Sequence, residues 1–168
     1  MTLPEEKLVQ LSVKRIKEFG FYINEMLFAQ KQTEHASQLL QIELALKLSF
    51  TIETNMVFLL ARVYYHFPDA LPDEILTDIQ VQNVFEIENL KQFQVGHSEI
   101  ILPTSTISTI VGHSLSHTRA LFAKNLAGTL LQENLMSVVD PSTVARHFFP
   151  RMFDEKAPLT TTPPASRE

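Results

Sequence analysis

The sequence contains no cysteine, which excludes disulfide bridges, a thiolate nucleophile and zinc sites built on cysteine ligands. Glycine is scarce, with 4 in 168 residues, and none stands in a GxGxxG or GxxxxGK[ST] arrangement. Those arrangements need glycine because backbone N–H groups must approach a phosphate closely, so a P-loop or a dinucleotide-binding turn is excluded. The longest uninterrupted apolar run, Met56–Ala61, is far shorter than the roughly 20 residues that cross a bilayer.

Positive charge is in the minority. Lys and Arg total 14 against 19 Asp and Glu, a net charge of −5, whereas nucleic-acid binders concentrate positive charge on one face. The opening MTLPEEKL carries acids where a signal peptide carries basic and then apolar residues. With 45% hydrophobic and 20% charged residues, the chain has a globular composition. We expect a soluble cytoplasmic domain without nucleic-acid partner or membrane insertion.

Alternation with a period of two residues is the strongest local pattern. Apolar side chains take every second position from Leu40 to Ile52, and polar ones such as Gln41 and Lys47 lie between them. This spacing predicts a long antiparallel strand with one buried and one wet face. The β-branched and aromatic content predicts three more strands, over residues 8–25, 56–67 and 75–88, with residues 26–34 as a connection.

The pattern becomes helical after Pro103. Apolar positions recur at spacings of three and four residues: Ile107, Ile110, Val111, Leu115, Thr118, Phe122 and Leu126. They predict an amphipathic helix reaching about Leu131, in which Gly112 indicates a kink or close packing. Asp140-Pro141 supplies an N-cap followed by proline at the first helical position, so a short helix is predicted through Phe149.

Strands followed by helices indicate an α+β fold, with the long amphipathic helix and the short C-terminal helix packed on one face of a four-stranded antiparallel sheet. Residues 1–153 are expected to form one domain. Residues 154–168 contain a Thr-Thr-Thr-Pro-Pro stretch and are expected to be a disordered tail.

His113 and His117 are spaced four residues apart, so they share one helical face, as two metal ligands would. The residues between them are Ser-Leu-Ser, which lack the general-base Glu of a zinc-protease helix. We therefore expect a surface or interface histidine pair and no metal site.

Other polar residues also give no sign of catalysis. Ser114 and Ser116 diverge around the helix from their histidine neighbours, and no strand–turn–helix elbow frames them. Glu86 and Glu88 share one face of the fourth predicted strand, where acids act as solubilising charge. We expect neither an enzyme nor a cofactor.

Aromatic and methionine side chains outside the clear alternation are candidates for an adaptable apolar groove, with core or oligomer contact as the alternative. They form two groups in the sequence: Phe19, Phe21, Tyr22 and Phe28, then Phe148, Phe149, Met152 and Phe153.

The elements taken in chain order also match a family pattern. The matching features are Arg15-Ile16 in the first strand, Ile79-Gln80 through Val84-Phe85 in the fourth, Leu102-Pro103, Arg119, the stretch from Gly128-Thr129-Leu130 to Leu135, and the final helix Val144–Phe149. Over roughly residues 8–150 the chain resembles the bacterial protein-export chaperone SecB. It departs from that family at Gln82-Asn83, where the family has paired glycines.

The resemblance implies a homotetramer, a dimer of dimers with the long helices packed between the dimers. It implies a holdase that binds unfolded preproteins without ATP, in grooves framed by the two aromatic groups, and delivers them to the motor SecA. The interface is then expected at Ile107, Val111, Ser114, His117 and Ala120. The SecA contact is expected at Leu76 and Asp78 on an exposed sheet face, with Glu18 and Glu25 as the nearest acidic candidates. The alternative is a SecB-like chaperone or interaction module for another client, such as an antitoxin, without an export role.

Overall fold

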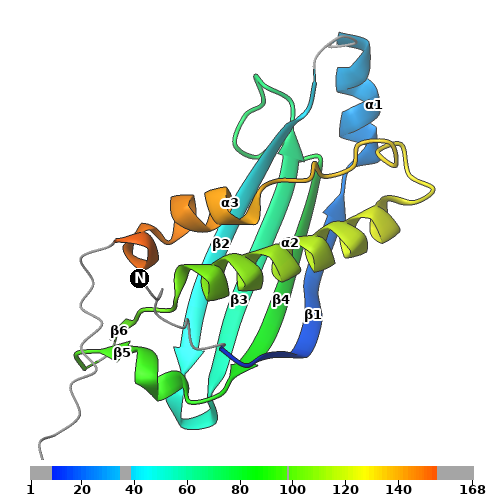
Figure 1. Ribbon diagram of the computed structural model, residues 1–168. Coiled ribbons are helices and arrows are strands. Elements are labelled where there is room, and N and C mark those ends of the chain that lie inside the picture. Colours follow the sequence, from blue (N-terminus) through cyan, green and yellow to red (C-terminus); the bar gives the residue numbers. More distant parts are fainter. Residues whose placement is uncertain (1–8, 35–38, 98, 155–168) are drawn as a thin grey trace, which may run out of the picture.

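Four antiparallel strands form the main sheet of the computed structural model, which describes residues 9–34, 39–97 and 99–154 (Figure 1). The strands are β1 (Leu11–Ile23), β2 (Gln41–Thr51), β3 (Met56–His66) and β4 (Thr77–Ile87). Their spatial order is β1-β4-β3-β2, so β1 and β2 are the two edges. The predicted α+β fold with a four-stranded antiparallel sheet is confirmed.

Strand β2 turns its apolar side chains toward the core, as its alternating sequence predicts. In the β2–β3 register Leu48 lies opposite Leu59, and Leu46 opposite Ala61, so the apolar row of β2 continues the buried row of β3. The helices cover this face, here called the inner face. Lys47 and the other polar β2 residues lie on the outer face, which no helix of the described ranges covers.

A single long helix covers the centre of the inner face (Figure 1). Helix α2 (Thr104–Leu126) buries Phe122 against two strands. The Phe122 ring packs edge-on to Tyr65 of β3 at 4.9 Å and to Phe21 of β1 at 6.3 Å between centroids. Burial raises the pKa of Tyr65 to about 12, because the phenolate is poorly solvated there.

Helix α2 ends at Leu126, five residues before the predicted Leu131. Ala127 leaves the helical conformation with a ψ of 127°, and Gly128 has a φ of +81°, which favours glycine. Leu131 is nevertheless fully buried, because the turn after the helix folds it back onto the core. The helical spacing of the apolar residues therefore extends past the last residue of the helix, and it predicted a helix that is too long.

The short helix α3 (Pro141–Phe148) begins as predicted. The Asp140 carboxylate accepts a hydrogen bond of 2.7 Å from the backbone N–H of Thr143, and this bond lowers the pKa of Asp140. Gly112 of α2 allows the close approach of α3, since an added Cβ would lie 3.1 Å from Pro141 Cγ. Close packing, not a kink, is therefore the role of Gly112.

A helix replaces the predicted connection after β1. Strand β1 ends at Ile23, and α1 (Glu25–Glu34) follows. The Asn24 side chain accepts a 2.9 Å bond from the Leu27 N–H at its first turn. Phe28 stacks on Phe67 with centroids 6.1 Å apart, which fixes α1 to the end of the sheet.

The remaining elements are small. A hairpin of β5 (Gln94–Val95) and β6 (Glu99–Ile100) precedes α2, and short 3-10 turns span Ile52–Thr54, Leu90–Phe93 and Pro150–Phe153 (η3). None of the helices in the described ranges has the length and hydrophobicity that a membrane span needs. The predicted tail lies, beyond Asp154, outside the described residues.

The packing of α2 generates a stability prediction. We expect Phe122→Ala to lower the free energy of unfolding by about 3–5 kcal/mol, because the large ring is fully enclosed. Phe19→Ala is the matched control: Phe19 is 53% exposed and its loss should cost less than about 1 kcal/mol. Urea denaturation followed by circular dichroism measures both, and equal losses would contradict the central position of Phe122.

Candidate binding surfaces

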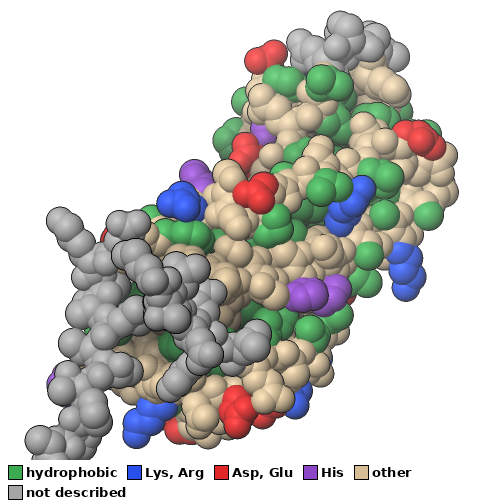
Figure 2. Space-filling model, viewed as in Figure 1, with side chains coloured by type: hydrophobic (Ala, Val, Ile, Leu, Met, Phe, Trp, Pro, Cys, Tyr) green, Lys and Arg blue, Asp and Glu red, His purple; other side chains and the backbone are tan. Residues whose placement is uncertain are grey.

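Half of the large exposed apolar side chains in the described ranges lie at one end of the sheet. Because all strands are antiparallel, β1 and β3 end where β2 and β4 begin, and α1 lies at this end (Figure 1). Met26 is 77% and Leu39 88% exposed there. We call the exposed set at this end the α1-end patch: Tyr22, Met26, Leu39, Ile42, Leu71 and Leu130. Figure 2 shows hydrophobic side chains over this end of the face that carries α2.

One hydrogen bond holds the segment after α2 beside α1, and a second closes the turn at the end of α2. The Glu25 carboxylate in the first turn of α1 accepts a 2.7 Å hydrogen bond from the Leu130 N–H. Thr129 Oγ1 donates to the Leu126 carbonyl at 2.7 Å. Leu130 remains 55% exposed, so an apolar side chain lies in the open beside the first turn of α1.

The apolar row of β2 is only half covered. Leu44, Leu46, Leu48 and Phe50 are each half-buried, and Ile42 at the start of the row is 40% exposed. Their counterparts on β3 are completely buried under α2. Helix α3 packs on α2 and on η3 and leaves this row partly accessible. Ile42 belongs to both, so the row reaches the α1-end patch, whereas Tyr22 of that patch faces the outer side of the sheet.

The first predicted aromatic group is divided by the sheet. Phe28 is 6% exposed, so its expected place in an open groove is wrong: stacking on Phe67 makes it core. Phe21 is half-buried against Phe122 on the inner face. Phe19, at a bulge in β1, and Tyr22 are exposed on the opposite, outer side. These four side chains share no groove.

The second group lies at the far end of α2. Phe148, Phe149, Met152 and Phe153 are half-buried at the junction of α3 and η3. Arg151 pairs with Glu99 of β6 at 2.7 Å, which places η3 near the start of α2. Phe21 packs near the end of α2, about 30 Å away along the helix. The two groups therefore do not come together.

The residues expected to contact SecA are buried or hydrogen-bonded to other residues of the same chain. Leu76 has no exposed surface, so its expected exposure is wrong: it precedes the first paired residue of β4 and packs into the core. Asp78 is on the outer face, where its carboxylate accepts from Arg62 Nε at 2.9 Å and Nη2 at 2.5 Å. This bond raises the pKa of Arg62. Glu18, on the inner face, accepts a 3.0 Å bond from Asn125.

The expected interface residues of α2 belong mostly to the core of the chain itself. Ile107, Val111 and Ser114 have no exposed surface, because the single apolar stripe of the helix is used by the sheet. His117 is half-buried and Ala120 is exposed. Next to the buried stripe, a row of α2 residues faces solvent: Thr109, His113, Ser116 and Ala120.

The histidine pair joins this row to a buried polar group. The rings of His113 and His117 stack at 6.1 Å, and His117 Nδ1 lies 2.6 Å from Asn83 Oδ1 of β4. Burial, then repulsion from His113, lowers the pKa of His117. The nearby buried Ser114 Oγ and Asn83 Nδ2 have no hydrogen-bond partner among the described residues. Among the described residues, no third histidine or carboxylate lies close enough to this pair to complete a metal site.

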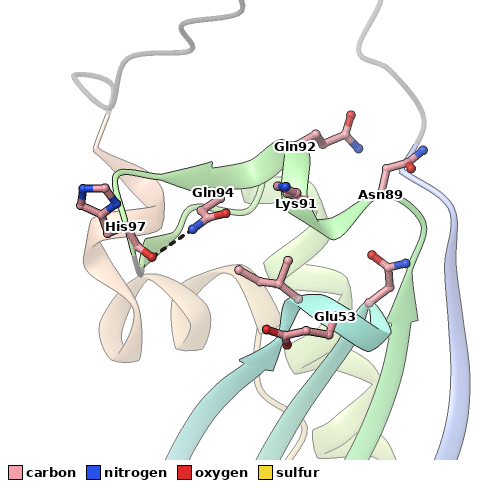
Figure 3. A pocket seen from close by; sticks show the side chains of 8 residues that line it. Glu53, Asn89, Lys91, Gln92, Gln94 and His97 are labelled. Atoms are coloured by element: carbon pink, nitrogen blue, oxygen red, sulfur yellow. Dashed lines mark hydrogen bonds between the residues drawn. The ribbon is translucent and has the colours of Figure 1, made fainter.

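A polar pocket (Figure 3) lies at the end of the sheet opposite to α1 (Figure 1). It is lined by Ile52, Glu53, Asn55, Asn89, Lys91, Gln92, Gln94 and His97. Asn55 is engaged in the backbone turn, since its side chain accepts from the Leu90 N–H at 3.1 Å. Gln94 donates to the His97 carbonyl at 3.0 Å. The lining holds no nucleophile beside a base, so the pocket does not resemble a catalytic site.

The lowered pKa of His117 generates a pH prediction. The unfolded chain binds a proton near pH 6.5, more readily than the folded chain, so stability is lost as the pH falls below about 6.5. His117→Gln should remove part of the loss in unfolding free energy between pH 7.5 and 5.5, measured by urea denaturation. The exposed His147→Gln is the control. An unchanged pH dependence in the His117 variant would contradict this role.

Comparison with known proteins finds no matching family model and no matching curated protein. Among solved structures, the SecB-like chaperone Rv1957 of Mycobacterium tuberculosis, in complex with a ChAD peptide from the Rv1956 HigA1 antitoxin, is similar at 9% identity. The similarity covers 77% of this chain and 90% of that chain, with a TM-score of 0.45. A protein of unknown function from Streptococcus agalactiae is similar over 70% of this chain and 88% of that chain, at 8% identity and a TM-score of 0.39. Few residues are identical, so the likeness lies in the arrangement of the backbone.

Proposed function

We propose that this chain is a holding chaperone, which binds apolar segments of unfolded proteins on the α1-end patch and the adjoining row of β2. The observation that carries the proposal is the half-covered row Leu44, Leu46, Leu48 and Phe50, continuous with Ile42. The apolar residues of β3 that lie opposite this row are fully buried under α2. The partly exposed row is therefore a feature of the β2 edge and not of the whole sheet. A cytoplasmic location accompanies this function.

An apolar surface of this kind suits clients of varied sequence. Apolar burial is non-directional and contributes about 25 cal/mol per Å² of area removed from water. Ordering an extended segment offsets much of that gain, so binding is reversible. Met26 adds an unbranched, adaptable side chain at the most exposed part of the patch.

Holding requires no nucleotide in this proposal. The four glycines of the sequence form no phosphate-binding arrangement, and the apolar surface contains no catalytic constellation. Client binding and release then follow from affinity alone.

The partner that receives the client is a separate question. Delivery of preproteins to SecA is the finer function that the family resemblance implies. The buried Leu76 and the Arg62-bound Asp78 give that contact little support. We therefore favour a client of the chain's own, such as an antitoxin, over a general role in export.

We also propose a homotetramer, with α2 as a contact between copies. One exposed row of α2 consists of Thr109, His113, Ser116 and Ala120 and carries no charged side chain, while the exposed Arg119 and Lys124 lie beside its C-terminal end. Small uncharged side chains let a second helix approach closely. This row replaces the buried residues expected from the apolar stripe.

Client binding can be tested by suppression of aggregation of a slowly refolding protein, measured by light scattering with and without ATP. We expect Met26→Ser with Leu130→Ser to reduce protection severalfold, because both side chains are exposed and their loss leaves the core intact. Val13→Ser, 44% exposed at the other end of β1, is the control. Full protection by the double variant, or a requirement for ATP, would contradict the proposal.

Assembly can be tested by light scattering at micromolar concentration, where four copies of a 19.1 kDa chain are expected. Ala120→Glu should reduce the mass, since it places a charge in the proposed contact. Ala29→Glu makes the same change on an exposed position of α1 and should leave the mass unaltered. A monomer in the wild type, or an Ala120 variant of unchanged mass, would refute the α2 contact.

A further inference from the structure

His113 and His117 are a pair of metal-ligating side chains that the apolar client surface does not use. They lie about one turn apart on α2, with ring centroids at 6.1 Å. His113 is exposed and His117 is half-buried. Figure 2 shows histidine side chains beside α2 on the visible surface. Residues four apart on a helix are neighbours, and two imidazoles at this spacing can bind one metal ion.

A buried partner orients one of the two rings. The Asn83 amide oxygen accepts hydrogen bonds, so His117 Nδ1, at 2.6 Å from it, carries the hydrogen. The lone pair is then on Nε2, which points away from Asn83. Metal-binding histidines usually donate their other ring N–H in this way, and the bond fixes both tautomer and ring orientation. Because Asn83 is fully buried in β4, His117 Nε2 is held ready to bind a metal ion.

His113 supplies a second nitrogen. Within the described ranges it makes no hydrogen bond and no ion pair, and its ring stacks on that of His117. Since the side chain is exposed, the ring can rotate and bring a nitrogen toward His117 Nε2. One helix therefore offers two imidazole ligands, one fixed and one adjustable.

A single chain leaves this site incomplete. A structural zinc ion takes four ligands in a tetrahedron. The described part of the chain provides no third histidine or carboxylate near the pair, and the sequence has no cysteine. The expectation of no metal site holds for one copy on these grounds. A second copy related by a twofold axis changes the count, because a symmetric contact brings the same two histidines to the same point.

The surroundings of the pair allow a second α2 to approach. The other members of the solvent-facing row are small and uncharged: Thr109, Ser116 and Ala120. Arg119, the nearest cation along the helix, donates to the Met136 carbonyl at 2.9 Å. Lys124 lies about two turns beyond His117. Imidazole ligands suit zinc, copper and nickel, whereas magnesium and calcium prefer oxygen, and a closed tetrahedral site favours zinc.

We propose that His113 and His117 of two copies together bind one Zn²⁺ between their α2 helices. The proposal rests on the α2 contact of the proposed homotetramer and names a metal ion for that contact. Because zinc binds the assembled form with four ligands and the separate chain with two, it stabilises assembly by mass action. Zinc supply then controls how many copies are joined.

Zinc binding can be tested by isothermal titration calorimetry of ZnCl₂ into the full chain after removal of metal with EDTA. We expect one zinc ion per two chains. His113→Gln should weaken binding about tenfold or more, since it removes two of the four ligands of the shared site, and its exposed position leaves the fold intact. His147→Gln, at an exposed histidine of α3, is the matched control and should bind as the wild type does. One zinc ion per single chain, no binding, or equal affinity of the His113 variant would overturn the proposal.

Assembly is tested by sedimentation velocity over a dilution series, with zinc or with EDTA. Zinc should lower the concentration at which the wild-type assembly dissociates by at least about tenfold, by mass action. The His113→Gln variant should show no such shift, and the His147→Gln variant should shift as the wild type does. An unshifted wild type, or an equal shift in the His113 variant, would contradict zinc as a link between copies.

The same measurements separate this inference from the proposed function. A wild type that assembles in EDTA but binds no zinc would refute only the metal site. A wild type that is a monomer in EDTA and pairs with one zinc ion per two chains would support the site and refute the tetramer as a metal-free assembly. Aggregation suppression is measured in EDTA, so the test of the chaperone does not depend on zinc.

Discussion

The contact between α2 and the two central strands is the constraint on which the other surfaces depend. Phe122 inserts between Tyr65 of β3 and Phe21 of the edge strand β1, and the apolar stripe of α2 covers β3 and β4. One helix cannot cover four strands, so the edges are left to smaller elements. The open row of β2, the exposed β1 and the solvent-facing row of α2 are all consequences of where this helix lies. Function is thus expected at the margins of the core.

The sequence predicted the elements whose patterns are set by burial on one side. The alternation from Leu40 to Ile52 and the N-cap Asp140 needed no tertiary information, and both were right. Helix α1 was missed because its segment lacks a clear apolar stripe, so residues 26–34 were predicted as a connection. The signal that was available is Asn24, whose side chain caps the first turn. The end of α2 was missed because Leu131 keeps the helical spacing but packs from a turn.

Prediction of the binding residues was weaker, because residue type does not reveal which side of an element meets solvent. Leu76 was expected beside Asp78 on one strand face, yet it precedes the β4 ladder, and the alternation does not govern its facing. Phe28 and Phe19 have the same side chain, but one stacks in the core and the other is exposed at a bulge. The apolar stripe of α2 was assigned to partner contact, whereas its own sheet uses that stripe first. Placing such residues requires the topology.

The strand order has a consequence for synthesis on the ribosome. β1 is the first strand to be made, but its partner β4 follows roughly 50 residues later, after β2 and β3. The three later strands form a meander from neighbouring segments, while β1 must wait for them. At roughly 5–20 residues per second, a nascent β1 spends several seconds without its ladder. During that interval the backbone groups of β1 are unpaired, and neighbouring chains on a polysome present the same unpaired strand.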